Sequence, residues 1–314
     1  MTKPIDRRKT TGAGVACVTG ASGIIGRRIV ARLMDAGWRV RALTRRGAAF
    51  DARVVVFKGD VCDASTLQEF VKNADVMFHC AAELNDESTM WDVNVDGTQN
   101  VVNAASRSGV TCFCFISSAG VVGNVTERIV DESTACRPYN LYEKSKWAAE
   151  NIVAKGIDGC RVAILRPTNV VGEGKPGAMS LAAGGLKNRL KLFVKGGECA
   201  HIVHADDVAA AAIYLMNLKS ETSQCYFVSC DEEPLNTYAG VNAMYVAYRN
   251  GISFDRRRVP VHLPVCVAHA VRRLVRGKRN RGDVCYSSKK LLSTGFSFSN
   301  GLEGAIRRIA EVDA

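Results

Sequence analysis

A glycine-rich turn near the start of the chain, Thr19-Gly20-Ala21-Ser22-Gly23-Ile24-Ile25-Gly26, constrains the fold more than any other feature. An apolar, β-prone stretch precedes it, and the apolar spacing of a helix follows it. A helix N-terminus offers free N–H donors and partial positive charge, which suit a pyrophosphate. Gly20 would permit the tight turn, Gly23 would let the phosphates approach, and Gly26 would let the helix pack on the strand. The turn therefore predicts a dinucleotide-binding site.

Strand and helix patterns alternate along most of the chain. The expected strands are 15–19, 38–43, 54–57, 76–80, 111–116, 161–165 and 225–228, and the expected helices are 27–36, 65–71, 91–108, 141–155 and 206–218. This alternation indicates right-handed βαβ units, and hence an α/β fold with a doubly wound parallel sheet of the Rossmann type.

The pattern loosens from residue 172, and residues 235–314 are mostly helical. We therefore expect a Rossmann domain for the dinucleotide and a smaller, mostly helical C-terminal domain for the substrate. The expected boundaries are 1–11 for a disordered tail, 12–172 and 201–231 for the dinucleotide-binding domain, and 173–200 and 232–314 for the substrate-binding domain.

Composition excludes several classes of protein. Hydrophobic residues make up 47% of the chain, and no stretch reaches the roughly 18 apolar residues that a membrane span requires. Residues 2–11 are polar and basic, unlike an export signal. The twelve cysteines lack the CxxC spacing of metal ligands, and several lie within apolar strands. We expect reduced core thiols, no metal site and a cytoplasmic location.

The net charge of +11 is concentrated in one segment. Between Arg256 and Arg281 there are nine Arg or Lys and no Asp or Glu, whereas the other 33 basic residues are matched by 31 acidic ones. The segment is either a solvated face or a contact for anionic groups, namely a phosphorylated substrate or a membrane surface. No nucleic-acid-binding motif accompanies the charge, so we expect a small-molecule substrate and no nucleic-acid partner.

The end of the second expected strand indicates which dinucleotide binds. An acidic residue there would hydrogen-bond the ribose 2′-hydroxyl of NAD, whereas an arginine would pair with the 2′-phosphate of NADP. The strand ends in Thr44-Arg45-Arg46, and no acid lies between Asp35 and Asp51, so NADP is favoured over NAD. Asp60, after the third strand, either reaches the adenine amino group or caps a turn.

Three polar residues form a candidate catalytic group. Tyr142 and Lys146 are four residues apart on an expected helix and so share a face. A neighbouring ammonium and the positive nicotinamide ring would favour the phenolate, so we expect the pKa of Tyr142 to fall toward working pH. Ser118, at the end of a parallel strand, would hydrogen-bond the same substrate oxygen. Such a tyrosine exchanges a proton with an oxygen whose carbon undergoes hydride transfer.

Several motifs occur in one order along the chain: TGASGIIG at 19–26, GDVCD at 59–63, HCAA at 79–82, NVDGT at 94–98, SSAGVVG at 117–123, PYNLYEKSK at 138–146, LRPTNVVG at 165–172 and VHADD at 203–207. Together with a C-terminal match at 291–309, they cover about residues 14–310. In these motifs the chain resembles the extended short-chain dehydrogenase/reductase family, in particular its NAD(P)-dependent nucleotide-sugar epimerase/dehydratase and 3β-hydroxysteroid dehydrogenase-like group.

The resemblance implies that Ser118, Tyr142 and Lys146 are the catalytic triad, and that Lys146 also contacts the nicotinamide ribose. It implies substrate contacts at Glu83, Ser118 and Asn169. With the turn and the strand ends above, the expected cofactor-binding residues are Gly20, Ser22, Gly23, Ile24, Ile25, Gly26, Arg45, Arg46, Asp60, Val61, Ala81, Ala82, Asn94, Ser117, Tyr142, Lys146 and Pro167. Family members commonly dimerise through the helices expected at 91–108 and 141–155, which implies a homodimer.

The chain departs from the family pattern at three places. Dehydratases carry an Asp-Glu pair where this chain has Ala119 and Gly120, which argues against 4,6-dehydration. Val122 replaces a frequent tyrosine. Nucleotide-sugar enzymes often bind the diphosphate with an arginine where this chain has Ala200, four residues before His204. We expect His204 to be structural rather than catalytic.

Three functions are compatible with these features. The first is an epimerase of a nucleotide sugar or related sugar, in which hydride leaves a sugar carbon and returns to its other face. The alternative is an NADP-dependent carbonyl reductase or alcohol dehydrogenase of the 3β-hydroxysteroid dehydrogenase or dihydroflavonol reductase kind, which Ala200, Val122 and the Arg45-Arg46 pair favour. The third, a non-catalytic NADP-binding scaffold, fits the intact Ser118, Tyr142 and Lys146 least well.

Overall fold

The computed structural model describes residues 14–173, 186–218, 224–276 and 282–312, so the expected tail at 1–11 lies outside the described residues. The chain divides into two compact units that interleave along the sequence. The first unit comprises Met1–Ile116, Ala148–Ile164 and Ala212–Gln224, and the second comprises Ser117–Trp147, Leu165–Ala211 and Cys225–Ala314. The ligand-binding roles expected for separate domains stay predictions.

A seven-stranded sheet forms the centre of the fold, as expected for a doubly wound α/β protein. Its strands lie in the order β10-β7-β5-β4-β1-β2-β3. Their bounds are β1 Val15–Thr19, β2 Arg39–Thr44, β3 Val55–Lys58, β4 Val76–His79, β5 Cys112–Ile116, β7 Arg161–Pro167 and β10 Gln224–Val228. Strand β1 pairs in parallel with β2 on one side and β4 on the other, so the chain order reverses direction at β1. Ligands of such sheets bind at the carboxyl ends of the strands beside this reversal.

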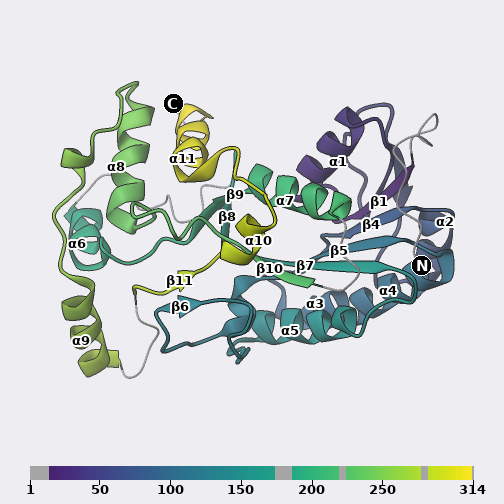
Figure 1. Ribbon diagram of the computed structural model, residues 1–314, viewed down its shortest axis with the longest axis horizontal. Helices are drawn as coiled ribbons and strands as arrows, with labels where there is room; N and C mark the ends of the chain where they lie inside the picture. Colours follow the sequence, from purple (N-terminus) through teal and green to yellow (C-terminus); the bar gives the residue numbers. More distant parts are fainter. Residues whose placement is uncertain (1–13, 174–185, 219–223, 277–281, 313–314) are drawn as a thin grey trace. The chain divides into compact units, whose positions relative to one another are not determined.

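The strands agree with the expected ones to within two residues because burial makes them apolar. Every residue of β1, β4 and β5 is buried. The edge strand β3 is largely exposed. In the first unit, α1 (Gly26–Asp35) and α4 (Gly97–Ser108) lie on opposite faces of the sheet (Figure 1). Helix α1 buries Ile29, Val30, Leu33 and Met34, the apolar face that its sequence spacing predicted.

The remaining helices follow the expected pattern with one difference. Their bounds are α2 Leu67–Val71, α3 Glu87–Trp91, α5 Leu141–Ala154, α6 Leu186–Lys195, α7 Ala205–Asn217, α8 Tyr238–Arg249, α9 Val265–Arg276, α10 Lys289–Ser293 and α11 Gly301–Val312. The single helix expected at 91–108 is interrupted. A π-helical turn, Asp92–Asp96, joins α3 to α4.

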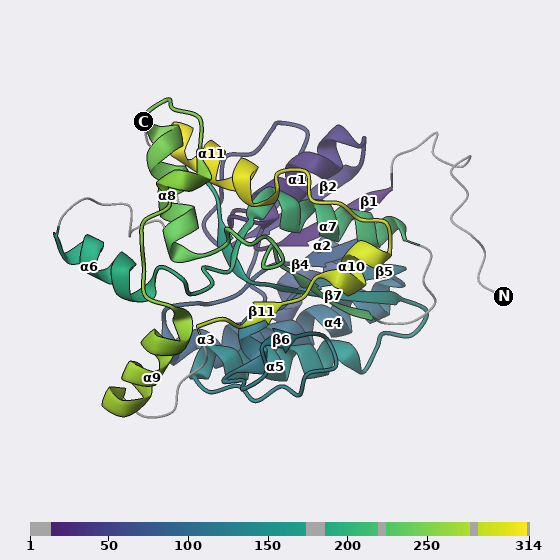
Figure 2. The ribbon, with the colours of Figure 1, turned by 60° about the vertical axis from the view of Figure 1, so that its left-hand side comes forward.

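The second unit contains two short parallel strand pairs and a helical C-terminal part. Strand β8 (Asn169–Val171) pairs with β9 (Ile202–His204), and β11 (Cys285–Tyr286) pairs with β6 (Ile129–Val130). Helices α8 and α11 pack side by side, as both ribbon views show (Figures 1 and 2). The loop after β5 rests on a buried cluster formed by Ala119, Val121, Val122, Val125, Val130, Phe227 and Val284. Val122, one of the departures from the family pattern, is therefore a core residue.

Candidate functional site

The glycine turn is closely packed against its own backbone and against the end of β4. Gly20 has a φ of +60°, and a Cβ built on it would lie 2.6 Å from the backbone nitrogen of Ala81. A Cβ built on Gly26 would lie 2.2 Å from the carbonyl oxygen of Gly20. The Gly23 N–H donates to that same oxygen at 2.9 Å. Any side chain at 20 or 26 would displace the turn, in agreement with the roles expected for these two glycines.

The N-terminus of α1 is open to an anion. Its N-cap, Ile25, makes no side-chain cap hydrogen bond, and the first turn of the helix contains no acidic residue. The guanidinium of Arg27 donates to the Ser22 carbonyl at 2.8 Å, and that of Arg28 donates to the Ile24 carbonyl at 2.8 Å. These arginines hydrogen-bond the carbonyls of the turn, and the start of a helix of this kind suits phosphate oxygens. The turn fits a dinucleotide pyrophosphate.

Arg45 and Arg46 are exposed directly after β2. Backbone hydrogen bonds are the main cause of the lowered pKa of Glu83, and the charge of Arg45 adds a smaller effect in the same direction. Asp60 accepts a hydrogen bond from the Cys62 N–H at 3.0 Å, so its carboxylate is used in a turn. Val61 is buried under α4, where it contacts the position that a Cβ on Gly97 would occupy.

A buried chain of hydrogen bonds connects β1, β4 and α4, and sequence reasoning missed it. Thr19 Oγ1 lies 2.7 Å from His79 Nδ1, and His79 Nε2 lies 2.9 Å from Thr98 Oγ1. Because the Thr98 hydroxyl donates to the Asn94 carbonyl at 2.6 Å, it accepts from His79, which therefore carries its proton on Nε2. Thr19 donates to Nδ1 and accepts from the Ala81 N–H at 3.3 Å. The sequence signal for this series of hydrogen bonds is that the polar His79 ends an apolar strand.

Asn94 and Glu83 hold the loop after β4 rather than pointing freely to a ligand. Asn94 Oδ1 accepts from the Glu83 N–H at 2.8 Å, and its Nδ2 donates to the Glu83 carbonyl at 2.9 Å. The Glu83 carboxylate accepts from the N–H groups of the next three residues, Leu84, Asn85 and Asp86. These backbone hydrogen bonds lower the pKa of Glu83. The π-helical turn thus lets Asn94 clamp the segment that carries Ala81 and Ala82.

In the second unit, Ser118 and Tyr142 are hydrogen-bonded through their side chains. Ser118 begins the turn after β5, and its Oγ also accepts from the Gly120 N–H at 3.1 Å. Ser117, before it, is buried and donates its N–H to the Leu165 carbonyl at 2.7 Å. Tyr142 lies in the first turn of α5, and the buried Lys146 follows one turn later. Two members of the expected triad are thus in contact, and the third lies on the same helix face.

Burial raises the pKa of the Tyr142 phenol, and the hydrogen bond with Ser118 opposes this effect. The expected fall of this pKa depends on the positive nicotinamide ring as well as on Lys146. The protein by itself holds Tyr142 as a neutral phenol at neutral pH. This form is the proton donor that reduction of a ketone requires.

The expected substrate residue Asn169 lies in β8, where its side-chain amide donates to the Ala200 carbonyl at 2.8 Å. Ala200 is fully buried, and its own N–H donates to the Asn236 carbonyl at 2.8 Å. The position where nucleotide-sugar enzymes often carry an arginine is therefore a buried alanine whose backbone is hydrogen-bonded within the fold. Pro167 is buried at the end of β7.

Sequence reasoning also missed a buried cation beside the triad helix. Arg166 is 4% exposed, and its guanidinium lies over the rings of Trp147 and Phe227, 5.8 and 5.5 Å from their centroids. Trp147 immediately follows Lys146 on α5. Arg166 thus supports the helix that carries Tyr142 and Lys146. It does so by cation–π contacts, which a sequence motif does not reveal.

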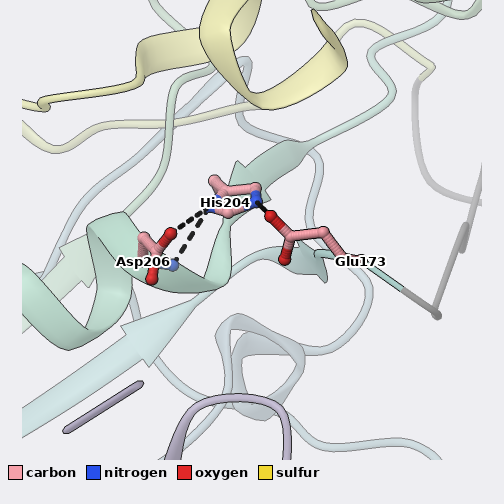
Figure 3. A group of neighbouring side chains, drawn as sticks. All are labelled: Glu173, His204 and Asp206. Carbon is pink, nitrogen blue, oxygen red and sulfur yellow. Dashed lines mark hydrogen bonds and ion pairs between the residues drawn. The ribbon is translucent and has the colours of Figure 1, made fainter. Parts of the chain in front are cut away.

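Glu173, His204 and Asp206 form a cluster whose ligand atoms lie within 4.8 Å of one another (Figure 3). His204 is buried, and its Nδ1 accepts from the Asp206 N–H at 3.2 Å. The Arg308 guanidinium pairs with Glu173 at 2.9 Å and also with Asp206. Because an arginine already balances both carboxylates, a metal ion would have to displace it. The cluster fits a charge network that joins α11 to β9, in line with a structural His204.

The twelve cysteines are all free. Burial raises the pKa of the Cys17 and Cys160 thiols to about 12. Thiols with such pKa values are poor nucleophiles and metal ligands at neutral pH. They fit the expected role as small core residues.

Comparison with known proteins shows the family of the chain. The profile of the NAD dependent epimerase/dehydratase family matches residues 16–227, which include the glycine turn, Ser118, Tyr142 and Lys146. The chain belongs to the NAD-dependent epimerase/dehydratase family. This family is part of the extended short-chain dehydrogenase/reductase group that the motifs resemble.

Relatives of the chain carry different activities in their names. A 3 beta-hydroxysteroid dehydrogenase/Delta 5→4-isomerase of Mycobacterium tuberculosis is 31% identical over 261 residues, covering 74% of this chain and 69% of the relative. An N-acetyl-alpha-D-glucosaminyl-diphospho-ditrans,octacis-undecaprenol 4-epimerase of Escherichia coli is 33% identical over 162 residues, covering 49% of this chain and 48% of the relative. The chain spans 54% of the length of a further curated relative, from Sinorhizobium fredii.

Solved structures share the fold of the family. The UDP-glucose 4-epimerase of Thermus thermophilus, in complex with NAD, superposes with a TM-score of 0.67 at 22% identity. The match covers 95% of this chain and 98% of the epimerase. At this identity the likeness shows the fold alone. Among the described residues, no helix has the length and apolar character needed to cross a membrane.

Proposed function

We propose that this chain is an NAD(P)-dependent epimerase that acts on a nucleotide sugar or a related, lipid-linked sugar. The observation that carries the proposal is the hydrogen bond between Ser118 and Tyr142, with the buried Lys146 one helical turn further on. These side chains form a unit that can take a proton from a hydroxyl group and give it back. The family of the chain and the open N-terminus of α1 support a nicotinamide dinucleotide as the cofactor.

In the proposed reaction, Tyr142 takes the proton of the hydroxyl on the carbon that is inverted. Ser118 hydrogen-bonds the same oxygen and so holds it in line with the phenol. The positive charge of Lys146 stabilises the phenolate while the keto-sugar exists. A bound nicotinamide would accept the hydride of that carbon and return it after the keto-sugar has turned over. Tyr142 then returns its proton to the oxygen. Among the cofactors of the family, we propose NADP, because Arg45 and Arg46 follow β2.

A specific observation favours a second candidate, an NADP-dependent dehydrogenase or carbonyl reductase. Ala200 is fully buried where nucleotide-sugar enzymes often carry a diphosphate-binding arginine, and Asn169 uses its amide to bind the Ala200 carbonyl. One expected contact for a diphosphate is therefore replaced by a buried alanine, and the expected substrate residue Asn169 uses its amide within the fold. The steroid dehydrogenase relative, which aligns with 74% of the chain, supports the same alternative. Here Tyr142 would donate its proton to the substrate oxygen once, and a reduced product would leave.

One experiment separates the two candidates. The protein is incubated with UDP-hexoses and, separately, with steroid and small aromatic ketones, each with catalytic or stoichiometric NADPH or NADP. Epimerisation predicts a new sugar isomer by NMR without net change in cofactor absorbance. Reduction predicts stoichiometric loss of NADPH. Tyr142→Phe should lower either activity at least about a hundredfold, whereas Tyr139→Phe is the matched control because Tyr139 is 74% exposed. Full turnover by Tyr142→Phe would refute both candidates.

We also propose that the protein is a homodimer that uses α4 and α5, by analogy with the family. Light scattering coupled to gel filtration tests the dimer. Charge reversal of Lys144, an exposed residue of α5, should dissociate it, and a monomer in the unaltered protein would contradict the proposal. A cytoplasmic location is proposed from the sequence and is tested by fractionation of cells that produce the protein.

A further inference from the structure

The surface of α6 combines exposed apolar side chains with positive charge. Leu190 is 63% exposed and Phe193 is 44% exposed. Their neighbours Arg189, Lys191 and Lys195 are exposed as well. The helix contains no acidic residue. Large apolar side chains beside cations are unusual on a surface that contacts only water.

The segment that leads into α9 has the same character. Val261 is 84% exposed and Val267 is 43% exposed. The three arginines at 256–258 form a short helical turn, and all three are exposed. From Arg256 to Arg281 the sequence contains nine basic residues and no acidic one. The sequence of α9, VCVAHAVRRLVR, is apolar in its first half and contains three arginines in its second half.

These two segments are joined within the second unit. The Leu263 N–H donates to the Phe193 carbonyl at 2.8 Å. His262 packs so closely over Gly196 that a Cβ there would lie 2.7 Å from the His262 Cβ. Helices α6 and α9 pack against each other, and both views show them at the same end of the second unit (Figures 1 and 2). The exposed apolar and basic groups of α6 and of the 256–270 segment therefore belong to one continuous part of the fold.

We propose that α6 and α9 dock this protein on the surface of an anionic lipid bilayer. Leu190, Phe193 and Val267 would enter the interface, and the surrounding arginines and lysines would pair with lipid phosphates. Basic residues near an anionic surface each add to the attraction, and amphipathic basic helices bind in the plane of such surfaces. A second copy of the chain is a poor partner, since two surfaces with such an excess of arginine and lysine would repel each other. This inference does not depend on the proposed reaction.

The test is sedimentation of the full-length protein with vesicles of phosphatidylcholine alone or with added phosphatidylglycerol. Binding is expected only to the anionic vesicles, and it should weaken as salt rises. Leu190→Ser with Phe193→Ser, and separately Arg256, Arg257 and Arg258 each to Glu, should each reduce the bound fraction at least tenfold. All these side chains are exposed, so the variants should keep the circular dichroism spectrum of the unaltered protein.

Matched controls carry the same changes elsewhere. Lys72, Arg107 and Lys155 are exposed cations outside the α6 and α9 surface, and changing each to Glu alters the net charge equally. Val55→Ser with Val56→Ser removes two exposed apolar side chains from β3. Both controls should keep vesicle binding.

Three outcomes would overturn the proposal. The first is no binding to anionic vesicles. The second is an equal loss of binding in the control variants, which would mean that net charge alone acts. The third is conversion of a dimer to a monomer by the Leu190→Ser, Phe193→Ser variant with vesicle binding retained, which would assign the surface to a second copy of the chain.

Discussion

Asn140 and Glu143 cap each other at the start of α5, on either side of the catalytic candidate Tyr142. The Glu143 N–H donates to Asn140 Oδ1 at 2.8 Å, and Asn140 Nδ2 donates to Glu143 Oε1 at 2.9 Å. Glu143 Oε2 also accepts from the Tyr139 N–H at 2.7 Å. This reciprocal pair satisfies N–H groups that the first turn of a helix leaves open, and so it fixes the turn that carries Tyr142.

Replacing Glu143 by alanine should therefore destabilise the protein by about 1 kcal/mol and lower turnover, because the first turn of α5 frays. Urea denaturation measures the stability, and steady-state kinetics measure the turnover. Lys155→Ala, on an exposed residue just after α5, is the control and should change neither. Equal stability of the Glu143→Ala variant and the unaltered protein would mean that the pair does not cap the helix.

Replacing Ser118 by alanine should shift the pH dependence of catalysis. The hydrogen bond from Ser118 lowers the pKa of Tyr142, against the larger effect of burial, which raises it. Without Ser118 this pKa rises further. In the direction that oxidises an alcohol, Tyr142 must lose its proton, so the rise of kcat/KM with pH should move to higher pH. A midpoint that stays in place or moves to lower pH would contradict the assigned contact.

Replacing Gly26 by alanine should weaken cofactor binding, with little change elsewhere in the sheet. The new Cβ would lie 2.2 Å from the Gly20 carbonyl oxygen, so the turn must open and its N–H groups lose their arrangement. We expect at least a tenfold weaker affinity for NADP by titration calorimetry. Gly37→Ala is the control: Gly37 has a φ of +80° and nothing within 4 Å of its added Cβ, so the change strains the backbone only. It should cost about 1 kcal/mol of stability and leave affinity unchanged.

Much of the fold could be predicted from the sequence because buried parallel strands are recognisable apolar runs. The expected strand at 54–57 is β3, Val55–Lys58, and the helix expected at 141–155 is α5. The helix expected at 91–108 is present as part of a continuous helical segment, but its π-helical turn at Asp92–Asp96 could not be predicted because the contact that accompanies this turn is not local. Asn94 lies in the π-helical turn and hydrogen-bonds the backbone of Glu83, eleven residues earlier. The periodicity of a helix in the sequence does not reveal such a contact.

The candidate site could likewise be predicted only in part from the sequence. The sequence motif predicted that Ser118 and Tyr142 act together, and the structure brings them into hydrogen-bond contact. Glu83 was expected to contact substrate, yet its carboxylate binds three backbone N–H groups of its own loop. The pairing of Arg308 with Glu173 joins residues far apart in sequence, so only the folded chain reveals it. Local motifs therefore identify candidate groups, whereas their hydrogen-bond partners depend on tertiary contacts.

Charge reversal at the end of β2 should change cofactor preference. Arg45 and Arg46 are exposed, and both are placed to meet the 2′-phosphate of NADP if the proposed cofactor is correct. The double change to Glu should weaken NADP binding by at least about tenfold, through loss of charge-assisted hydrogen bonds, and leave NAD binding unchanged or stronger. Lys72→Glu, an exposed cation after α2, is the control. Equal effects on NAD and NADP would assign these arginines no role in selecting the cofactor.

Asp207 links the start of α7 to the N-terminus of α11 through several hydrogen bonds. Its Oδ1 accepts from the N–H groups of Ser299 and Asn300 at 3.1 and 3.0 Å, and its Oδ2 accepts from the Gly301 N–H at 3.1 Å. The side chains of Ser299 and Asn300 also donate to Oδ1. Asp207 is fully buried, so this one carboxylate satisfies donors that water cannot reach. It also places a negative charge at the positive end of α11.

Asp207→Ala should therefore destabilise the protein by about 3 kcal/mol, since it leaves several buried donors without an acceptor. Asp207→Asn keeps one acceptor oxygen and removes the charge, so its loss should be smaller but measurable. Urea denaturation gives both values, and hydrogen exchange should show faster opening at the first turn of α11 in each variant. A surface control, Glu303→Ala, removes only exposed side-chain contacts, among them the ion pair with Arg307, and should cost less than about 1 kcal/mol. If Asp207→Ala is no more destabilising than this control, the hydrogen bonds of Asp207 do not hold α11 in place.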